Sequence, residues 1–182
     1  GNLWLATLDG LARYDGHAFR VWRNDPDDPH GLPGNDVQQV LVDPEDQVWL
    51  SVNDAGVARY RPDRDGFERW RHQPGRPDSL PGDRIWALAP DGAGGIWLGG
   101  FGTGLARLTR DGAITRYQAL AMPGGDPCPL HVTALDVDAD GSVWVGGTQG
   151  LCRWHPDTGF EPVPMAGTAA TIPIIADLRE QG

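Results

Sequence analysis

The acidic run from Asp136 to Gly141 has the clearest chemical signature in the chain, because Asp136, Asp138 and Asp140 alternate with small apolar residues. This spacing matches the opening of a calcium-binding loop, in which carboxylates at alternate positions ligate the ion. The acidic ligand that such a loop needs at its twelfth position is replaced by Gly147. The favoured interpretation is therefore a tight turn between two strands, and we expect no metal ion and no cofactor.

Two cysteines and five histidines are the other candidates for covalent or metal chemistry. The histidines show no spacing that suits zinc. Cys152 stands where three similar phrases have alanine, so a small buried side chain accounts for it. A strand is expected to separate Cys152 from Cys128 by more than bonding distance, and we therefore expect no disulfide between them.

The elements that would position any site come from an internal repeat. Trp4, Trp49, Trp97 and Trp144 recur at intervals of 45, 48 and 47 residues. A phrase of the type Gly-Leu-Ala-Arg-Tyr follows each tryptophan, then a pair of apolar residues three positions apart. A fourth apolar run precedes the next tryptophan. Four short runs separated by Gly, Asp, Asn and Pro are typical of an antiparallel meander, not of helices.

Four strands in about 45 residues is the size of one β-propeller blade, so the chain is predicted to be all-β. In the second repeat, strands A to D are expected at 37–43, 47–52, 56–61 and 67–72. The blades are expected at about 1–23, 37–72, 85–118 and 132–164. The first blade has strands B, C and D only, and a lone A strand is expected near 173–178. The prediction is a single propeller region, a fragment of four four-stranded blades permuted by one strand.

The two ends leave alternatives open. The lone strand could pair with the N-terminal strands of the same chain and close a small ring. Alternatively, the region is an arc of a larger ring, and its unpaired edges could support an edge-to-edge dimer. The absence of an initiator methionine favours a piece of a longer protein.

The connections between blades repeat as well. Two of them end in Leu-Pro-Gly, and Leu32 and Leu80 are predicted to plug the space beneath their loops. The third, at 126–131, departs from this phrase.

The formal net charge of −10 disfavours a nucleic-acid partner, whose phosphates need a surplus of Lys and Arg. It also disfavours an anionic membrane surface. No stretch approaches the ~20 apolar residues of a membrane span, so membrane contact is expected only through downstream segments outside this sequence.

The phrases resemble the two-component regulator propeller repeat, whose pattern runs V-x-x-I-x-x-D-x-x-G-x-L-W-I-G-T, then G-G-L-x-R-Y, then F-x-x-Y and S-L-P. Residues 132–147 and 85–100 carry the first part, 150–154 and 104–108 the second, and 78–81 the linker phrase. The resemblance extends over the whole chain. Members often form seven-bladed rings outside the cytoplasmic membrane, upstream of a membrane helix and a histidine kinase or diguanylate cyclase domain. The resemblance therefore implies a periplasmic input module of a transmembrane signalling protein.

One arginine stands at the same place in every C strand, namely Arg13, Arg59, Arg107 and Arg153. A ring of cations could meet an anionic ligand. The favoured alternative is structural, an ion pair between blades or a stem packed over the neighbouring blade, because strand C lies far from a propeller's central channel.

Topology predicts where a ligand could bind. The D–A linkers and B–C turns share one face, and the residues there differ between blades although the surrounding phrases repeat. Variable loops on a repeated frame are the usual place for binding. The candidate ligand-binding residues are Asp36, Arg84 and His131 before the A strands and Asn53, Asp54, Phe101 and Gln149 in the B–C turns. The alternative is ordinary variable loops without a ligand.

Together these features favour a non-catalytic sensor that binds a small molecule, such as a carbohydrate, or a protein. One alternative is a scaffold with protein partners only. A second is a propeller enzyme of the lyase or sialidase type, which would need a convergent set of acid, base and charged binding residues that the sequence does not display.

Overall fold

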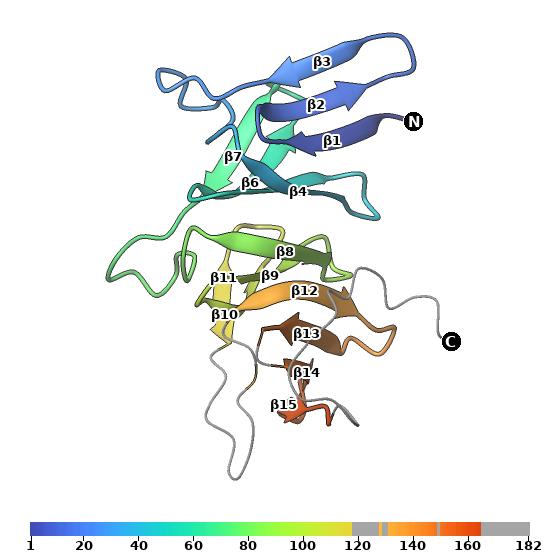
Figure 1. Cartoon of the computed structure of the whole chain (residues 1–182), viewed down its shortest axis with the longest axis vertical. Helices are drawn as coiled ribbons and strands as arrows, with labels where there is room; N and C mark the ends of the chain where they lie inside the picture. Colours follow the sequence, from blue (N-terminus) through green and yellow to red (C-terminus); the bar gives the residue numbers. More distant parts are fainter. Residues whose placement is uncertain (118–127, 129–130, 149, 165–182) are drawn as a thin grey trace. The chain divides into compact units, whose positions relative to one another are not determined.

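The computed structural model describes residues 1–117, 128, 131–148 and 150–164. Within these residues all regular elements are β-strands, and no helix is long and apolar enough to cross a membrane. The strands form antiparallel sheets in which neighbours in the chain are neighbours in space (Figure 1). This is the meander that the repeat predicts, and the predicted all-β propeller class is confirmed.

Each sheet corresponds to one repeat and is called a blade here. Blade 1 contains β1 (Leu3–Thr7), β2 (Gly10–Tyr14) and β3 (Phe19–Trp22). Blade 2 contains β4 (Val37–Val42), β5 (Val48–Val52), β6 (Gly56–Arg61) and β7 (Gly66–Trp70). Blade 3 contains β8 (Ile85–Pro90), β9 (Ile96–Gly100), β10 (Gly104–Leu108) and β11 (Ile114–Tyr117). Blade 4 contains β12 (Val132–Val137), β13 (Val143–Gly147), β14 (Gly150–His155) and β15 (Gly159–Pro162).

Blade 1 has three strands in the described part of the chain, in the order β1-β2-β3, as the sequence predicts. The lone A strand that the sequence predicts near 173–178 lies outside the described residues. The chain divides into two compact units between Ile85 and Trp86. Unit 1 holds blades 1 and 2, and unit 2 holds blades 3 and 4.

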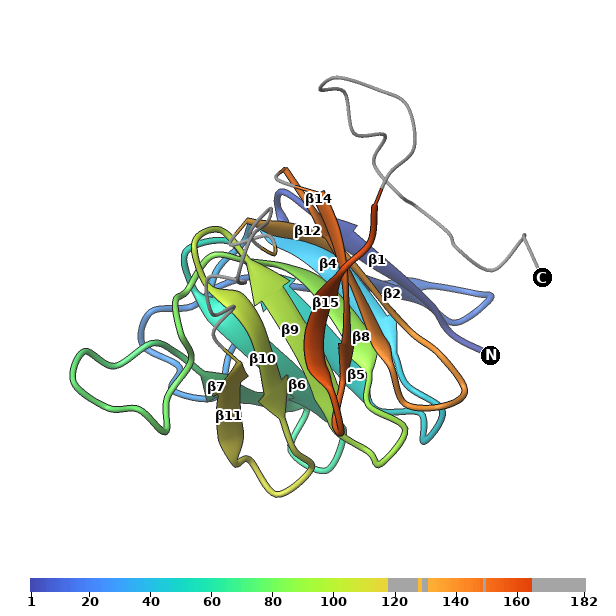
Figure 2. The same cartoon turned by 90° about the horizontal axis from the view of Figure 1, so that it is seen from below.

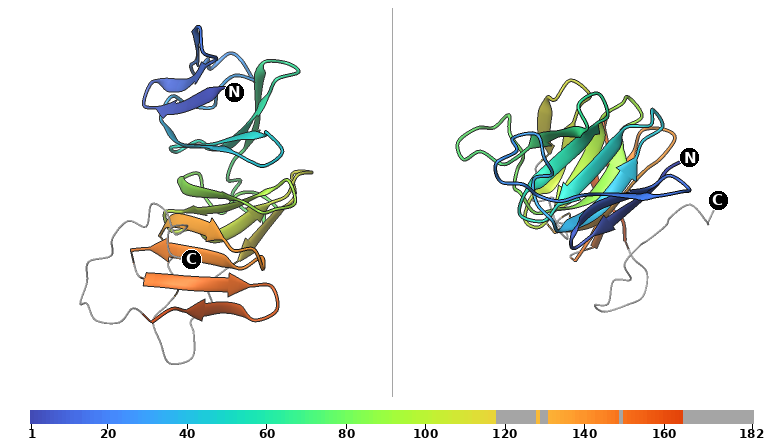
Figure 3. Two further views of the ribbon diagram at one scale, coloured as in Figure 1. Left: turned by 90° about the vertical axis from the view of Figure 1, so that its right-hand side faces the viewer. Right: turned by 90° about the horizontal axis from the view of Figure 1, so that it is seen from above.

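In unit 1 the two sheets enclose one core, visible as facing blue and teal strands in Figure 3. Trp22 of blade 1 lies edge-on to Tyr60 of blade 2, with ring centroids 5.3 Å apart. Leu11 and Leu50 are fully buried in the same cluster. Burial of each such side chain contributes about 1.5–3 kcal/mol, so the contact between the blades stabilises the unit.

Unit 2 is built the same way. Trp97 of blade 3 packs on Trp154 of blade 4 with ring centroids 4.8 Å apart, beside Val143 and Val145. The strands that carry the two tryptophans, β9 and β14, are labelled in Figure 2. Strand β9 is buried along its whole length, as is β5 in unit 1. This explains why the B strands are continuous apolar runs: both faces of the sheet are covered.

Glycines in the repeated phrases are required by close approaches of the chain. A Cβ on Gly56 would lie 2.3 Å from the carbonyl oxygen of Trp70, and its φ of +79° is in the left-handed region. A Cβ on Gly99 would lie 2.3 Å from Cγ1 of Val132 in the next blade. The first glycine lets strand C begin, and the second lets strand A of blade 4 pack against strand B of blade 3.

Candidate functional site

The D–A linkers and B–C turns lie at the same end of their sheets, as the topology predicts. In unit 1 the backbone N–H of Asn53 donates to the carbonyl of Asp36 at 2.8 Å. In unit 2 the N–H of Thr148 donates to the carbonyl of His131 at 3.3 Å. These backbone bonds bring the predicted candidate residues into neighbouring positions within each unit.

Asp36 and Asn53 form the first pair. Nδ2 of Asn53 donates to Oδ2 of Asp36 at 3.0 Å, and Nε2 of Gln38 donates to Oδ1 at 2.5 Å. Both carboxylate oxygens of Asp36 therefore accept hydrogen bonds that fix the loop. This arrangement suits a structural role better than a general base, which needs a free oxygen directed at the substrate.

Arg84 and Asp54 form the second pair, on the surface of unit 1. Nε of Arg84 lies 3.6 Å from Oδ1 of Asp54, and both side chains are exposed. The Arg71 guanidinium donates to the Asp54 carbonyl at 2.8 Å and lies 3.6 Å from the Asp83 carboxylate. Opposite charges alternate here, so the rim of unit 1 can hydrogen-bond to a polar ligand without a strong net charge of its own.

Phe101 and His131 form the third pair, in unit 2. Their rings are stacked with centroids 4.0 Å apart and planes inclined by 10°, and Phe101 is 44% exposed. The N–H of Gly102 donates to Nδ1 of His131 at 2.8 Å, so the imidazole proton is assigned to Nε2. Trp86 adds a third ring, 5.7 Å from Phe101. The result is an aromatic cluster (Trp86, Phe101 and His131) with one accessible ring and one ring N–H donor.

Trp86 was not among the residues predicted from the sequence. The sequence does set Trp86 apart. The other seven tryptophans occupy repeated apolar positions, whereas Gln38 and Thr133 stand at the positions equivalent to Trp86. A tryptophan outside the repeated phrases is not needed by the frame. Gln149, the remaining candidate, lies outside the described residues.

The C-strand arginines pack within their own blades. The Arg59 guanidinium lies over the Trp49 ring, 4.9 Å from its centroid, and pairs with Glu68 at 2.7 Å. Arg107 pairs with the buried carboxylate of Asp91 at 2.8 Å. The arginines have the predicted structural role, but these ion pairs lie within one blade and not between blades. The A–B turn or strand D of the same sheet supplies the carboxylate.

The acidic run is a turn between β12 and β13. Oδ2 of Asp138 accepts from Nε1 of Trp144 at 2.8 Å. Asp140 accepts from the N–H of Ser142 at 2.9 Å and from Arg153 at 2.6 Å. The Ser142 bonds, backbone first, are the main reason that the pKa of Asp140 lies below its usual range. Within the described residues, no three His, Cys, Asp or Glu side chains are grouped to hold a metal ion.

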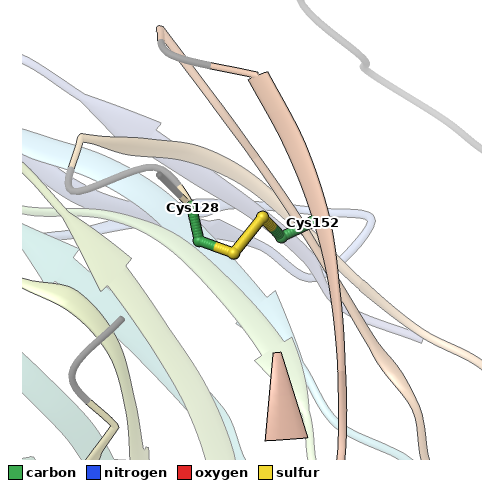
Figure 4. The surroundings of a disulfide bond; sticks show 2 residues. All are labelled: Cys128 and Cys152. Atoms are coloured by element: carbon green, nitrogen blue, oxygen red, sulfur yellow. A yellow bond between two sulfur atoms is a disulfide. The ribbon is translucent and has the colours of Figure 1, made fainter. Parts of the chain in front are cut away.

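Cys128 and Cys152 form a disulfide, with Cα atoms 5.6 Å apart, so the expectation of no bond is wrong (Figure 4). That expectation measured separation in the plane of the sheet, whereas the bond places Cys128 beside Cys152 of strand C, out of that plane. Unit 1 shows the same placement, because Leu32 lies in one buried cluster with Ala58. Cys128-Pro129 repeats Leu32-Pro33, and Cys152 replaces Ala58. The disulfide therefore stands where unit 1 has an apolar contact between leucine and alanine. The replacement of both residues by cysteine is the sequence feature that could have predicted the bond.

An open hollow is lined by residues at the opposite end of blade 3, including Asp91, Ala93, Arg107 and Arg110. Its charged groups include the Arg107–Asp91 ion pair that holds the A–B turn. The hollow is thus formed mainly by groups with structural roles, and the loop end with its aromatic cluster is the better candidate.

The repeat itself matches a known family. Residues 79–102 match the family described as two component regulator propeller. This segment is similar to the two-component regulator propeller repeat. A 28-residue stretch is also 54% identical to a histidine kinase of Formosa agariphila, covering 15% of this chain and 2% of the kinase. The predicted resemblance to the regulator propeller family is confirmed.

Solved structures with the same fold include propellers of different function. The extracellular domain of a hybrid two-component system from B. thetaiotaomicron is similar over 92% of this chain and 24% of that chain, with 22% identity and a TM-score of 0.78. A virginiamycin B lyase from Staphylococcus aureus is similar over 92% of this chain and 53% of the lyase, with 14% identity and a TM-score of 0.66. At these identities the likeness shows the propeller fold alone. The match to the regulator propeller repeat is an additional similarity that does not depend on the fold.

Proposed function

We propose that this region is a non-catalytic, extracytoplasmic sensor segment of a transmembrane signalling protein. The regulator propeller repeat at residues 79–102 is the observation that carries the proposal. The similar extracellular domain of a hybrid two-component system supports the same role. The chain spans only part of each of these relatives, so the signalling output belongs to segments beyond it.

The disulfide supports an extracytoplasmic location on independent physical grounds. Disulfides persist in oxidising compartments such as the periplasm and are rare where cytosolic thiols keep cysteines reduced. Cys128 and Cys152 are both buried and joined to each other. Protease added to spheroplasts that contain the full-length protein should digest this region, and protection until the membrane is broken would contradict the location.

The ligand site of the proposal is the loop end of the blades. In unit 2 the aromatic cluster offers the exposed ring of Phe101, stacked on His131. In unit 1 the rim offers the exposed Arg84 and Asp54 groups. Aromatic faces stack on ring-shaped ligands with polar edges, so a sugar or a similar small ring compound is the ligand class that the unit 2 cluster favours.

A binding screen tests this function. The intact chain is titrated with mono- and disaccharides and organic acids, and affinity is measured by calorimetry. Phe101→Ala should weaken binding about tenfold, because an aromatic contact contributes about 0.5–1.5 kcal/mol beyond its buried area. Leu8→Ala, at an exposed position in the β1–β2 turn, is the matched control and should leave affinity unchanged.

The outcomes separate the function classes. Binding without chemical change of the ligand, lost in Phe101→Ala, supports the sensor. Turnover of a bound compound would overturn it in favour of an enzyme. Absence of small-molecule binding, together with capture of a protein partner through the same loops, would replace the sensor with a scaffold.

A further inference from the structure

The linker before blade 4 contacts both of the blades that it joins. On the side of blade 4, Cys128 is bonded to Cys152 of strand β14, and both residues are buried. On the side of blade 3, the N–H of Gly102 donates to Nδ1 of His131 at 2.8 Å, and the His131 ring stacks on Phe101. His131 is three positions after Cys128, so their Cα atoms can be at most about 11 Å apart. The disulfide is therefore a close neighbour of the aromatic cluster.

The two linkers of unit 1 are held to the preceding blade by a different group. Oδ1 of Asn35 accepts from the backbone N–H of Asn24 at 2.7 Å. In the same way, Oδ1 of Asp83 accepts from the N–H of His72 at 2.7 Å. Each acceptor stands two positions before a strand A, and each donor stands two positions after a strand D. This contact, called the polar lock here, ties the end of each linker to the blade before it.

The linker before blade 4 has no such acceptor in its sequence. Leu130 stands two positions before β12, where Asn35 and Asp83 stand before β4 and β8, and a leucine side chain cannot accept a hydrogen bond. His131 supplies a contact with the preceding blade instead, because its ring nitrogen accepts from the N–H of Gly102. The aromatic cluster thus takes the place of the polar lock, and its geometry depends on how the linker is held.

The disulfide holds this linker on blade 4. The connection from β11 to β12 is 14 residues long, 118–131, and the bond at Cys128 leaves three of these residues before β12. A short tether samples fewer conformations than a long one, so the bond lowers the entropy that is lost when His131 packs on Phe101. An apolar contact alone would hold the linker less firmly, because in unit 1 the plug Leu32 acts together with the polar lock.

We propose that the Cys128–Cys152 disulfide is the positioning element of the aromatic cluster, because it holds His131 where this ring can stack on Phe101. The inference rests on the proposed function for its consequence, which is that the bond preorganises the ligand site of unit 2. The bond acts through the linker, and neither buried cysteine is expected to touch a ligand. This role in the geometry of the site is separate from the contribution of the bond to stability.

The first test replaces the bond by an apolar contact. Cys128→Leu with Cys152→Ala, called the cysteine variant here, keeps a packed linker but removes the covalent tether. In wild type the Phe101 ring should shift the His131 ring protons upfield in the NMR spectrum, since the two rings face each other at 4.0 Å. Most of this shift should be lost in the cysteine variant, with Phe101→Leu as the reference for complete loss. His131→Gln identifies the signal, and a full shift in the cysteine variant would overturn the proposal.

Hydrogen exchange at Gly102 gives a second measurement of the same geometry. Its N–H donates to His131, so it should exchange about three- to tenfold faster in the cysteine variant. The N–H of Asp91, which donates to the Gly95 carbonyl at 3.0 Å at the opposite end of blade 3, is the internal control and should be unchanged. Equal exchange at Gly102 in the two proteins would contradict the positioning role.

Val143→Ala is the matched control for a general loss of stability. Val143 is fully buried in the core of unit 2 and lies in β13, outside the linker. The substitution should lower the melting temperature and leave the His131 shift and the Gly102 exchange as in wild type. If it changed both signals as much as the cysteine variant does, the bond would have a structural role only.

Calorimetry with the mono- and disaccharides of the screen measures the consequence for binding. Each saccharide that binds wild type should bind the cysteine variant about three- to tenfold more weakly, because the cluster must then be ordered as the sugar binds. Unchanged affinity would overturn the role of the bond in the ligand site. If no saccharide binds wild type, the proposed ligand class fails, whereas the His131 and Gly102 signals still decide whether the bond positions the cluster.

Discussion

The linkers that precede blade 2 and blade 4 fasten to their blades with different chemistry. In unit 1, Leu32 is fully buried, and the guanidinium of Arg69 donates to the carbonyls of Asp28 and Gly31. In unit 2, Cys128 takes the place of the leucine and is bonded covalently to Cys152. In both units the residue at this linker position contacts the same place in strand C, Ala58 or Cys152, whereas the type of contact differs.

Loss of the apolar plug should have the largest effect. Leu32→Ala leaves a cavity in the core of unit 1 and should lower the free energy of unfolding by about 3–5 kcal/mol. Urea denaturation followed by tryptophan fluorescence measures it. Val42→Ala, at a position that is 46% exposed, should change stability by less than about 0.5 kcal/mol. Similar losses in the two variants would mean that Leu32 does not carry the linker contact.

Loss of the disulfide should have the next largest effect. Cys128→Ala with Cys152→Ala removes a crosslink over 24 residues and should lower the free energy of unfolding by about 2–4 kcal/mol. Reducing agent should lower the stability of wild type and leave this variant unchanged. A wild type insensitive to reductant under denaturing titration would contradict the role of the bond.

Conversion of one linker into the other sharpens the comparison. Cys128→Leu with Cys152→Ala gives unit 2 the Leu-Pro and alanine pair of unit 1. It should recover about 2 kcal/mol over the double alanine variant by refilling the space with apolar atoms. It should also be indifferent to reductant in the same titration. Failure to recover stability would show that the two linkers do not follow equivalent paths.

The hydrogen bonds from Arg69 should contribute less to the free energy of unfolding than either Leu32 or the disulfide. Arg69→Met keeps much of the apolar stem but leaves the carbonyls of Asp28 and Gly31 without this donor, at a cost of about 1–2 kcal/mol. Hydrogen exchange should rise at the Phe67 amide, which donates to His30 in the same linker at 2.7 Å. Unchanged exchange there would mean that Arg69 does not hold the linker.

Acid should produce the smallest effect, at the start of the unit 1 linker. The Arg23 hydrogen bond, then its charge, lower the pKa of Asp9 in the folded state. A lowered folded pKa means that the stabilisation is present above the unfolded pKa and is lost as pH falls through the folded one. Asp9→Asn should therefore remove a small part of the acid dependence of stability. Identical pH profiles in the two proteins would contradict this role.

The sequence predicted the frame because the frame repeats. The spacing of Trp4, Trp49, Trp97 and Trp144 was enough to place the strands, since every repeat adds evidence for the same meander. The sequence also predicted that the D–A linkers and the B–C turns share one end of the sheets, because strand order alone decides which turns lie together.

Side-chain partners were beyond the reach of the sequence. The stack of Phe101 on His131 depends on contacts between adjacent blades. The approach of Cys128 to Cys152 is signalled by the paired exchange of leucine and alanine for cysteine, but only once the contact between Leu32 and Ala58 is known. The C-strand arginines were assigned to the wrong neighbour: their carboxylates lie on the adjacent strand D or in the A–B turn of the same blade, which spacing alone does not reveal.

A protease that cut the chain once anywhere between Cys128 and Cys152 would release neither fragment. The bond would still join the two pieces, one carrying blades 1 to 3 and the other carrying β14 and β15. Thr148, which is exposed and follows β13, falls within this interval, so a nick beside it would leave two pieces held together until a reductant reached the bond.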